Sequence, residues 1–405
     1  MPTFTYTARG RDGKKITGTL TSENRQAVSQ MLISRGLTAE TVQAMTGAQA
    51  GKKMGRTDRK VKTGELLVFT RQLSTIVSAG LPLLQGLDIL AEQTEDANFA
   101  AVIYAIGEDV ESGSSFSEAL RKYPQVFPDL YVSMVRAGEA GGDLDGVLLQ
   151  LADYLEAMAE LRRRIKSAMT YPVAALSLIL LISAGLIVWV VPQFQEIFST
   201  LGATLPKPTL ILIAASNVLR SWKVLIVIAV FIGIIMAIRA YGTTAGGRYN
   251  LDALKLRIPV FGQLQRKVSI SRFTRTLSAL TRSGVAILQA LEIVERTAGN
   301  EVFARIVAEA GDSVRSGQTL AEPLSRSDQF PPMVTRMIAV GEKTGALEQM
   351  LTKISDFYDS EVKATVDSLT SLIEPILIMM MGIIVGGIVL ALFLPIFSMS
   401  QHINK

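Results

Sequence analysis

The side chains that most often carry out chemistry are nearly absent from this sequence. Its 405 residues include no cysteine, which excludes disulfides, thiolate metal sites, iron–sulfur clusters and a cysteine nucleophile. The single histidine, His402, lies at the C-terminal end. Catalytic triads and histidine zinc sites need an imidazole that is held by partner residues. We therefore expect no catalytic residue, no metal and no cofactor, although carboxylate or serine chemistry stays open.

One short polar motif, Gly-Glu-x-x-Gly-x-Leu, nevertheless occurs twice. Its two copies comprise Gly138, Glu139, Gly142 and Leu144, and then Gly341, Glu342, Gly345 and Leu347. Glycine tolerates a positive φ and the close approach of two helices, so the motif predicts a corner between helices. At such a corner the glutamate can cap a helix N-terminus or pair with an arginine. Contact with a partner protein is the second interpretation of the motif.

Two arginines and two aspartates are candidate neighbours of these glutamates. Arg71 and Arg275 occupy matching places near the start of a helix and are candidate ion-pair partners. Asp143 and Asp145 follow Glu139 closely, and together these carboxylates could bind a hard cation. The second copy of the motif replaces the first aspartate by alanine, so such a cation site would not be duplicated.

The motif is part of a longer internal repeat. Residues 69–74 recur at 273–278, and glycines, leucines and a phenylalanine follow at the same spacing of 204. After one deletion the matches continue at a spacing of 203. So many matches with a single deletion indicate a duplication within the chain. Pro192 and Pro395 also match, and we expect each of them to end its membrane span at the same place in each repeat.

Apolar residues within each copy recur at three- and four-residue steps, which predicts helices. In the first copy this pattern breaks at Gly80, at Gly113, at residues 127–128 and at residues 141–142. We predict five or six short helices in each copy, which together form a cytoplasmic domain followed by one membrane helix. The sequence leaves open whether the two copies pair within one chain or between chains.

Three long apolar runs indicate membrane spans. The chain is 49% hydrophobic and only 19% charged, with a mean hydropathy of +0.33. We predict spans at 171–192, 223–241 and 374–398, each near the length that crosses a hydrocarbon core of about 30 Å. A buried globular helix is the alternative for the short second run. In the third span Gly382 and Gly386 form a small-xxx-small face for helix packing.

The basic residues predict the orientation of these spans. They crowd the entrance to the first span between residues 162 and 166, and they also follow the second span. The segment 193–222 holds few of them, so it is predicted to be a short periplasmic loop, with 399–405 as a periplasmic tail. The N-terminus and both large polar regions then lie in the cytoplasm. Because the apolar runs of the first and third spans, which begin at Val173 and Ile376, carry no acidic or basic residue, a small transporter is only a remote alternative.

The N-terminal segment differs in composition from the rest of the chain. Residues 1–45 predict a small α+β module, with two alternating strands joined near Asp12-Gly13, a helix from Ser22 to Gly36 and a third short strand. Residues 46–63 form a basic, glycine-containing linker that is predicted to be flexible.

These boundaries complete the predicted domain organisation. The two cytoplasmic helical domains are predicted at 64–170 and 266–373, joined by a cytoplasmic connector at 242–265 after the second span. The net charge of +5 is too small, without a clustered basic patch, to indicate nucleic-acid binding.

The order of several motifs resembles the type II secretion system F family. These motifs are Phe-Thr-Arg-Gln-Leu at 69–73, the duplicated Gly-Glu motif, Thr170-Tyr171-Pro172, Val191-Pro192-Gln193-Phe194, Leu394-Pro395-Ile396-Phe397, and Phe4, Tyr6 and Ala8 near the N-terminus. The family includes PilC-like platform proteins of type IV pilus assembly and GspF-like platform proteins of type II secretion. The resemblance extends over nearly the whole chain. Leu-Arg-Lys-Tyr-Pro at 120–124 and the Leu-Pro-Ile-Phe ending favour the pilus branch.

The resemblance implies a mainly α, integral membrane protein of the bacterial inner membrane without enzymatic activity. It implies a role in coupling a cytoplasmic hexameric ATPase to the insertion or extraction of pilin subunits. Further implied partners are pseudopilins, other inner-membrane components of the machine, membrane lipid and further copies of the chain, but no nucleic acid. The alternative is the equivalent platform of a type II secretion system, which moves pseudopilins for protein export.

Overall fold

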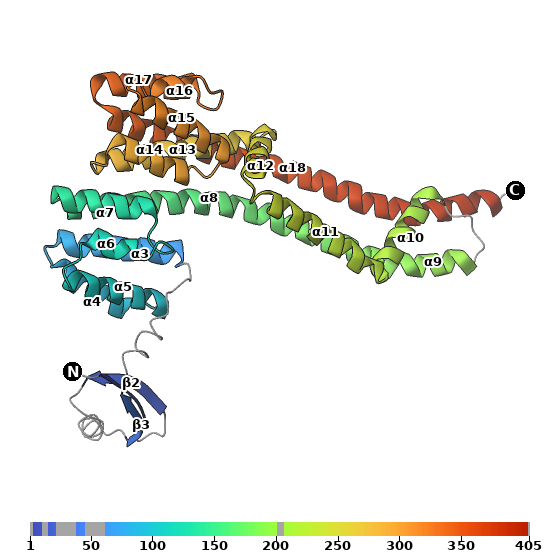
Figure 1. Cartoon of the computed structure of the whole chain (residues 1–405). Coiled ribbons are helices and arrows are strands. Elements are labelled where there is room, and N and C mark those ends of the chain that lie inside the picture. Colours follow the sequence, from blue (N-terminus) through green and yellow to red (C-terminus); the bar gives the residue numbers. More distant parts are fainter. Residues whose placement is uncertain (1–2, 10–14, 22–37, 45–60, 201–205, 404–405) are drawn as a thin grey trace. The chain divides into compact units, whose positions relative to one another are not determined.

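The computed structural model describes residues 3–9, 15–21, 38–44, 61–200 and 206–403 (Figure 1). The chain divides into two compact units. The first unit contains the residues up to 62 together with 81–127, and the second contains 63–80 together with 128–405.

The first unit begins with a three-stranded antiparallel sheet. Its strands are β1 (Thr3–Arg9), β2 (Lys15–Thr21) and β3 (Thr38–Ala44), in the order β2-β1-β3. Threonine, aromatic and β-branched residues, which favour strands, dominate all three segments. The predicted strands are therefore confirmed, whereas the predicted turn at 12–13 and the predicted helix at 22–36 lie outside the described residues.

Three helices complete the first unit: α4 (Leu83–Gln93), α5 (Ala97–Glu111) and α6 (Phe116–Arg121). Side chains cap two of their starts, because Asp96 accepts hydrogen bonds from two backbone N–H groups of α5 and Ser115 accepts one from α6. The largest side chains of their core are almost fully buried, and they are Leu87, Leu90, Phe99, Ile103, Ile106, Phe116 and Phe127.

The second unit contains the other duplicated helices. From the first copy come α3 (Thr63–Ser78), α7 (Asp129–Gly141) and α8 (Leu144–Gly185). The second copy supplies α13 (Phe261–Arg282), α14 (Ile287–Thr297), α15 (Glu301–Arg315), α16 (Ala321–Ser325), α17 (Pro332–Thr344) and α18 (Leu347–Ile403). Within the described residues each copy therefore has six helices, as the sequence predicted.

Two helices continue from the duplicated helical copies into the apolar runs without interruption. α8 is 42 residues long and continues through one π-helical turn, η1 (Leu186–Val190), into α9 (Val191–Thr200). α18 has 57 residues and is therefore about 86 Å long. Pro192 and Pro395, which are predicted to end their membrane spans, do not end the helices, since α9 and α18 both continue beyond them.

Three helices among the described residues are long and apolar enough to cross a membrane. They are the continuous run Leu144–Ile197, α11 (Lys223–Tyr241) and Leu347–Pro395, and each overlaps one of the three predicted spans. None of the residues of α11 is buried in the chain, so the alternative of a buried globular helix is wrong. A helix that is apolar on all sides and exposed on all sides fits a membrane environment.

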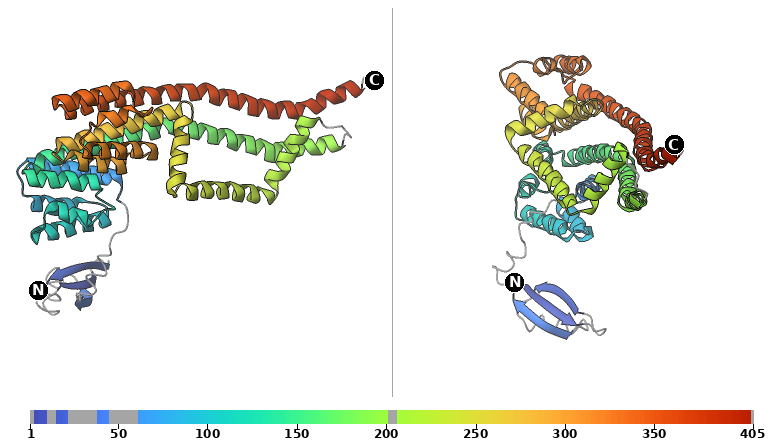
Figure 2. Two further views of the ribbon diagram at one scale, coloured as in Figure 1. Left: turned by 45° about the horizontal axis from the view of Figure 1, so that its top comes forward. Right: turned by 90° about the vertical axis from the view of Figure 1, so that its right-hand side faces the viewer.

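The segments on either side of α11 are also helical. The segment expected to be a plain periplasmic loop contains α9 and α10 (Lys207–Arg220). Two buried hydroxyls of α10 donate hydrogen bonds to backbone carbonyls of membrane helices, from Thr209 to Ala391 at 2.5 Å and from Ser216 to Ile187 at 2.7 Å. The connector after α11 contains α12 (Ala245–Arg257), which runs across the axis of α11 (Figure 2).

Candidate functional site

Each copy of the Gly-Glu motif forms the corner between a short helix and the long helix that follows it. This corner joins α7 to α8 in the first copy and α17 to α18 in the second. Gly142 ends α7 with a φ of 71° and Gly345 ends α17 with a φ of 72°, a conformation that side chains disfavour. The N–H of Asp143 donates to the carbonyl of Gly138 at 2.9 Å, which closes the α7 terminus. The Asp143 carboxylate accepts from Gly146 N–H at 3.2 Å and so caps α8.

The first glycine of each motif permits close packing across the corner. A Cβ atom on Gly138 would lie 3.0 Å from side-chain atoms of Val147, and one on Gly341 would lie 2.9 Å from the Cα of Leu347. Both distances are shorter than ordinary van der Waals contact. The glycines thus bring the short helix of the corner directly against the first turn of the long helix.

The glutamate of the second motif joins α17 to α16. Its two carboxylate oxygens accept from the backbone N–H groups of Leu320, at 2.6 Å, and Ala321, at 3.0 Å. These N–H groups lie at the start of α16, where helix amides lack partners within the helix. Glu342 therefore caps α16 from α17. Glu139 occupies the matching place on α7 and is half-buried.

The two repeated arginines form a duplicated ion-pair cluster with the long helices. Arg71 on α3 donates to Asp153 at 2.8 Å and to Glu156 at 2.5 Å, both on α8. These hydrogen bonds, first of all the one to Asp153, raise the pKa of Arg71 above its ordinary value. We call this set of contacts, in either copy, the arginine clamp.

In the second copy Arg275 on α13 binds Asp359 on α18 and approaches Asp356 at 3.5 Å. The expected pairing of Arg275 with Glu342 is wrong, because Glu342 instead caps α16. Sequence reasoning missed the four carboxylates of the two clamps. The sequence does contain a signal for them, because the acidic residues at 153 and 156 recur at 356 and 359, a spacing of 203. The two members of each pair lie about one helical turn apart.

The long helices of the two copies pack against each other within this chain. Next to the membrane spans they share an apolar cluster with α13, composed of Leu161, Leu264, Val268, Val362, Val366 and Leu369. Farther from the spans the hydroxyl of Tyr154 on α8 lies 3.2 Å from that of Thr276 on α13. Burial raises the pKa of Tyr154, which keeps its hydroxyl neutral. The two copies therefore pair within one chain along α8.

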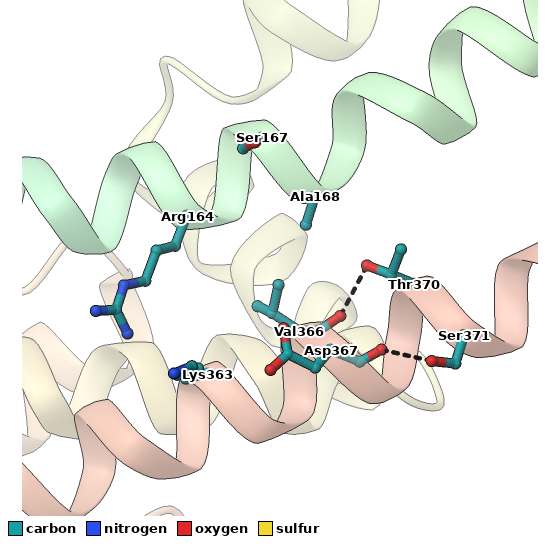
Figure 3. Close-up of a pocket in the computed structure, with 8 residues that line it drawn as sticks. All are labelled: Arg164, Ser167, Ala168, Lys363, Val366, Asp367, Thr370 and Ser371. Carbon is teal, nitrogen blue, oxygen red and sulfur yellow. Dashed lines mark hydrogen bonds between the residues drawn. The ribbon is translucent and has the colours of Figure 1, made fainter.

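Charged residues line a cavity of about 600 Å³ between α8 and α18 (Figure 3). Arg164 lies on α8, and Lys363 and Asp367 lie on α18. On α8, Arg164 also donates hydrogen bonds to Glu160, and these lower the pKa of Glu160. The positive charge of Lys363 makes a smaller contribution to the same shift. Positions 160 and 164 correspond to 363 and 367 in the duplication, so the charges are reversed between the copies. Because of this reversal, opposite charges are present between α8 and α18, whereas two identical copies would bring like charges together there.

The described residues contain no group of three or more histidine, cysteine, aspartate or glutamate side chains that could hold a metal. The Asp143 carboxylate, a candidate cation ligand, instead caps α8. In the third span, a Cβ on Gly382 or Gly386 would meet no atom of the described chain within 4 Å. The predicted small-residue face therefore packs against no described helix of this chain and is open to lipid or another protein.

Comparisons with known proteins match this organisation. The family model "Type II secretion system (T2SS), protein F" matches residues 69–192 and again residues 273–395, and the model "Type II secretion system protein F, N-terminal domain" matches residues 1–43. The twofold match coincides with the duplication found in the sequence.

Curated relatives extend the similarity to the full length. The chain is 44% identical to the type IV pilus assembly protein PilC of Thermus thermophilus, with 98% of each chain covered. It is 39% identical to the PilC of Myxococcus xanthus, covering 99% of this chain and 96% of that one. It is 35% identical to the type II secretion system protein F of Pseudomonas aeruginosa, with both chains fully covered.

The capping role of Glu342 predicts a specific loss of stability. Glu342→Ala leaves two amide groups at the start of α16 without a protein acceptor, which should lower the free energy of unfolding by about 1–3 kcal/mol. The measurement is unfolding of the purified chain in detergent. Glu322→Ala, at an exposed carboxylate that binds only Arg326, is the control and should stay within about 0.5 kcal/mol. Equal effects of both variants would contradict the cap.

The arginine clamp predicts energetic coupling between α13 and α18. A double-mutant cycle of Arg275→Ala and Asp359→Ala should give a coupling energy of about 1 kcal/mol or more, since both side chains are mostly buried. The same cycle at Arg282 and Glu348 is the comparison, because this pair joins the same helices at 3.7 Å but is exposed. It should give about 0.5 kcal/mol or less. A coupling at Arg275 no larger than at Arg282 would contradict the clamp.

Proposed function

Because this chain belongs to the type II secretion system protein F family, we propose that it is the inner-membrane platform of a type IV pilus assembly machine. The pilus branch is favoured because relatives named for pilus assembly reach higher identity than the relatives named for secretion. The second candidate is the platform of a type II secretion system. In either case the role is mechanical and not enzymatic.

The platform couples a cytoplasmic ATPase to the movement of pilin subunits. The single observation that carries this proposal is the unbroken course of α18, from the Gly345 corner through its apolar run. A continuous helix resists bending, so a displacement of its cytoplasmic part also displaces its membrane part. The second arginine clamp and Glu342 attach the other helices of the second copy to this element.

In this proposal the ATPase acts on the cytoplasmic helical copies and shifts or turns them. The Gly-Glu corners lie where the short helices meet the long ones, and so they transmit force between the two. Their residues have the structural role described above, and contact with the ATPase is the further role proposed for them.

Pilin subunits, in contrast, are recognised within the membrane. The exposed apolar surface of α11 and the open glycine face of Gly382 and Gly386 are candidate contacts for the membrane helix of a pilin or pseudopilin. Other inner-membrane components of the machine, lipid and a second copy of the chain are the remaining candidates for these surfaces.

A deletion strain tests the proposal and separates its two branches. Loss of long surface fibres with protein export intact is the result expected of a pilus platform. Intact fibres with exported proteins trapped in the periplasm would instead establish the secretion branch. A strain with neither defect would overturn the platform proposal and return attention to a transporter.

The stiffness of α18 is testable without removing the protein. Ser368, Ser371 and Leu372 are exposed on α18 just before its apolar run, so all three can be changed together without opening a core. The triple glycine variant should lose most surface fibres, because glycine weakens a helix by about 1 kcal/mol per position relative to alanine. The triple alanine variant is the matched control and should keep its fibres. Equal fibre numbers in both, at equal protein levels, would contradict the lever.

Cysteine labelling tests the proposed orientation, in which the N-terminus and both helical copies are cytoplasmic and the C-terminus is periplasmic. The natural chain has no cysteine, so single substitutions report on one position each. A membrane-impermeant thiol reagent should label Thr204→Cys and Ser400→Cys from outside, but not Ser115→Cys or Ser325→Cys. External labelling at Ser325→Cys would overturn both the orientation and the cytoplasmic ATPase contact.

A further inference from the structure

The corner between α12 and α13 has an unusual backbone. Ile258, Pro259 and Val260 connect the two helices, and Val260 adopts a φ of 68° and a ψ of −56°. The N–H of Phe261 donates to the carbonyl of Pro259 at 2.8 Å, which closes a γ-turn of the rare form with positive φ. A β-branched residue in this region is strained. Strain of this kind persists where the surrounding structure imposes it, and it clusters at functional positions.

The same corner presents apolar side chains to the outside. Leu254, Ile258, Val260 and Phe261 are each between 40% and 59% exposed. Gly262 lies beneath them, and a Cβ there would come within 2.2 Å of the carbonyl oxygen of Leu256. The chain therefore turns tightly around Gly262 and leaves this apolar group about half exposed. We call these four side chains the corner patch.

Basic residues lie on the two helices that lead to the corner patch. Arg239 lies in the last turn of α11 and Arg257 ends α12, directly before the patch residue Ile258, and neither forms an ion pair with any residue in the described ranges. Arg248 lies 3.5 Å from Glu301, and Lys255 binds Asp252 at 2.7 Å. Exposed apolar side chains beside uncompensated cations are the combination found on segments that bind anionic membrane surfaces.

The corner patch also lies at the depth where a membrane surface is expected. Only residues 242–244 separate α11 from α12, and α12 then runs across the α11 axis (Figure 2). Ile258 and Phe261 border an apolar cavity of about 330 Å³ together with Met169 and Leu369. Met169 lies about 6 Å along its helix before the apolar run that begins at residue 173. Leu369 lies about 10 Å before the run that begins at residue 376. The headgroup zone of a bilayer extends about 5–8 Å beyond its hydrocarbon.

We propose that the α12–α13 corner is a membrane-surface anchor that inserts the corner patch among the headgroups of anionic phospholipids. The leaflet is the one that faces the two helical copies, whichever side of the membrane that is. The tight turn at Val260 holds the apolar side chains outward, and Arg239 and Arg257 bind lipid phosphates. Since α12 contacts α15 through Arg248 and Asp252, the anchor fixes the second helical copy close to the bilayer. This inference is independent of the pilus or secretion role.

Depth-dependent fluorescence quenching tests the anchor on the full chain in lipid nanodiscs. Leu254→Cys and Ile258→Cys, each labelled with an environment-sensitive fluorophore, are the test variants. Met333→Cys and Val340→Cys on α17 are the controls, because they are equally exposed apolar positions in the same copy. Phosphatidylcholine with a doxyl group near its headgroup is the quencher, in discs with or without phosphatidylglycerol.

The anchor predicts quenching of about half of the fluorescence at 254 and 258, and almost none at 333 and 340. Adding phosphatidylglycerol should increase the quenching, and Arg257→Gln in the Ile258→Cys chain should remove that increase. Quenching at 258 equal to that at 333 would overturn the proposal. A blue-shifted but unquenched signal that grows with the number of chains per disc would also overturn it, in favour of contact with a second copy. Quenching that is indifferent to phosphatidylglycerol would overturn the anionic part.

Discussion

The structure depends on one constraint, which is that a chain in hydrocarbon must satisfy its own backbone hydrogen bonds. A helix does this locally, so the membrane spans must be helical. In this protein the same helices do not stop at the end of the apolar runs, and α8 and α18 continue as parts of the two helical copies. α3 and α7 pack on α8, and α13 and α17 pack on α18. Each long helix thus belongs both to a helical copy and to a membrane span.

Two kinds of contact attach the short helices to the long ones. The glycine corners remove side-chain volume so that α7 and α17 lie directly on α8 and α18. The arginine clamps attach a second short helix to each long one, because charged hydrogen bonds join α3 to α8 and α13 to α18. Packing sets the distance between helices, and the directional hydrogen bonds fix their rotation. The corner and the clamp together attach two helices to each long helix.

The duplication has diverged where its copies meet each other. Glu160 and Arg164 on α8 correspond to Lys363 and Asp367 on α18, with the order of charges reversed. The motif glycines and the clamp arginines, in contrast, are the same in both copies. The reversed charges are consistent with a pairing that occurs inside one chain.

The sequence by itself determined the helical class, the three apolar runs, the duplication and the places where helices break. These are local properties: apolar spacing sets helix periodicity, a long apolar run sets a span, and glycine at 142 and 345 sets a left-handed helix end. It also limited the chemistry, since a chain with one terminal histidine and no cysteine offers few reactive groups. The family resemblance drawn from short ordered motifs was confirmed by matches over both copies.

Which polar groups meet depends on the tertiary packing of the helices. From the sequence, several carboxylates were possible partners of Arg275. It pairs with Asp359 and not with Glu342 because of the way α13 lies across α18. Helicity through Pro375 and Pro395 was likewise not predictable, because proline removes one backbone hydrogen bond but packing of the surrounding helix can offset that loss. The same holds for α10, whose buried hydroxyls bond to carbonyls distant in sequence. Contacts between distant segments depend on the relative placement of whole helices, and local residue patterns do not encode it.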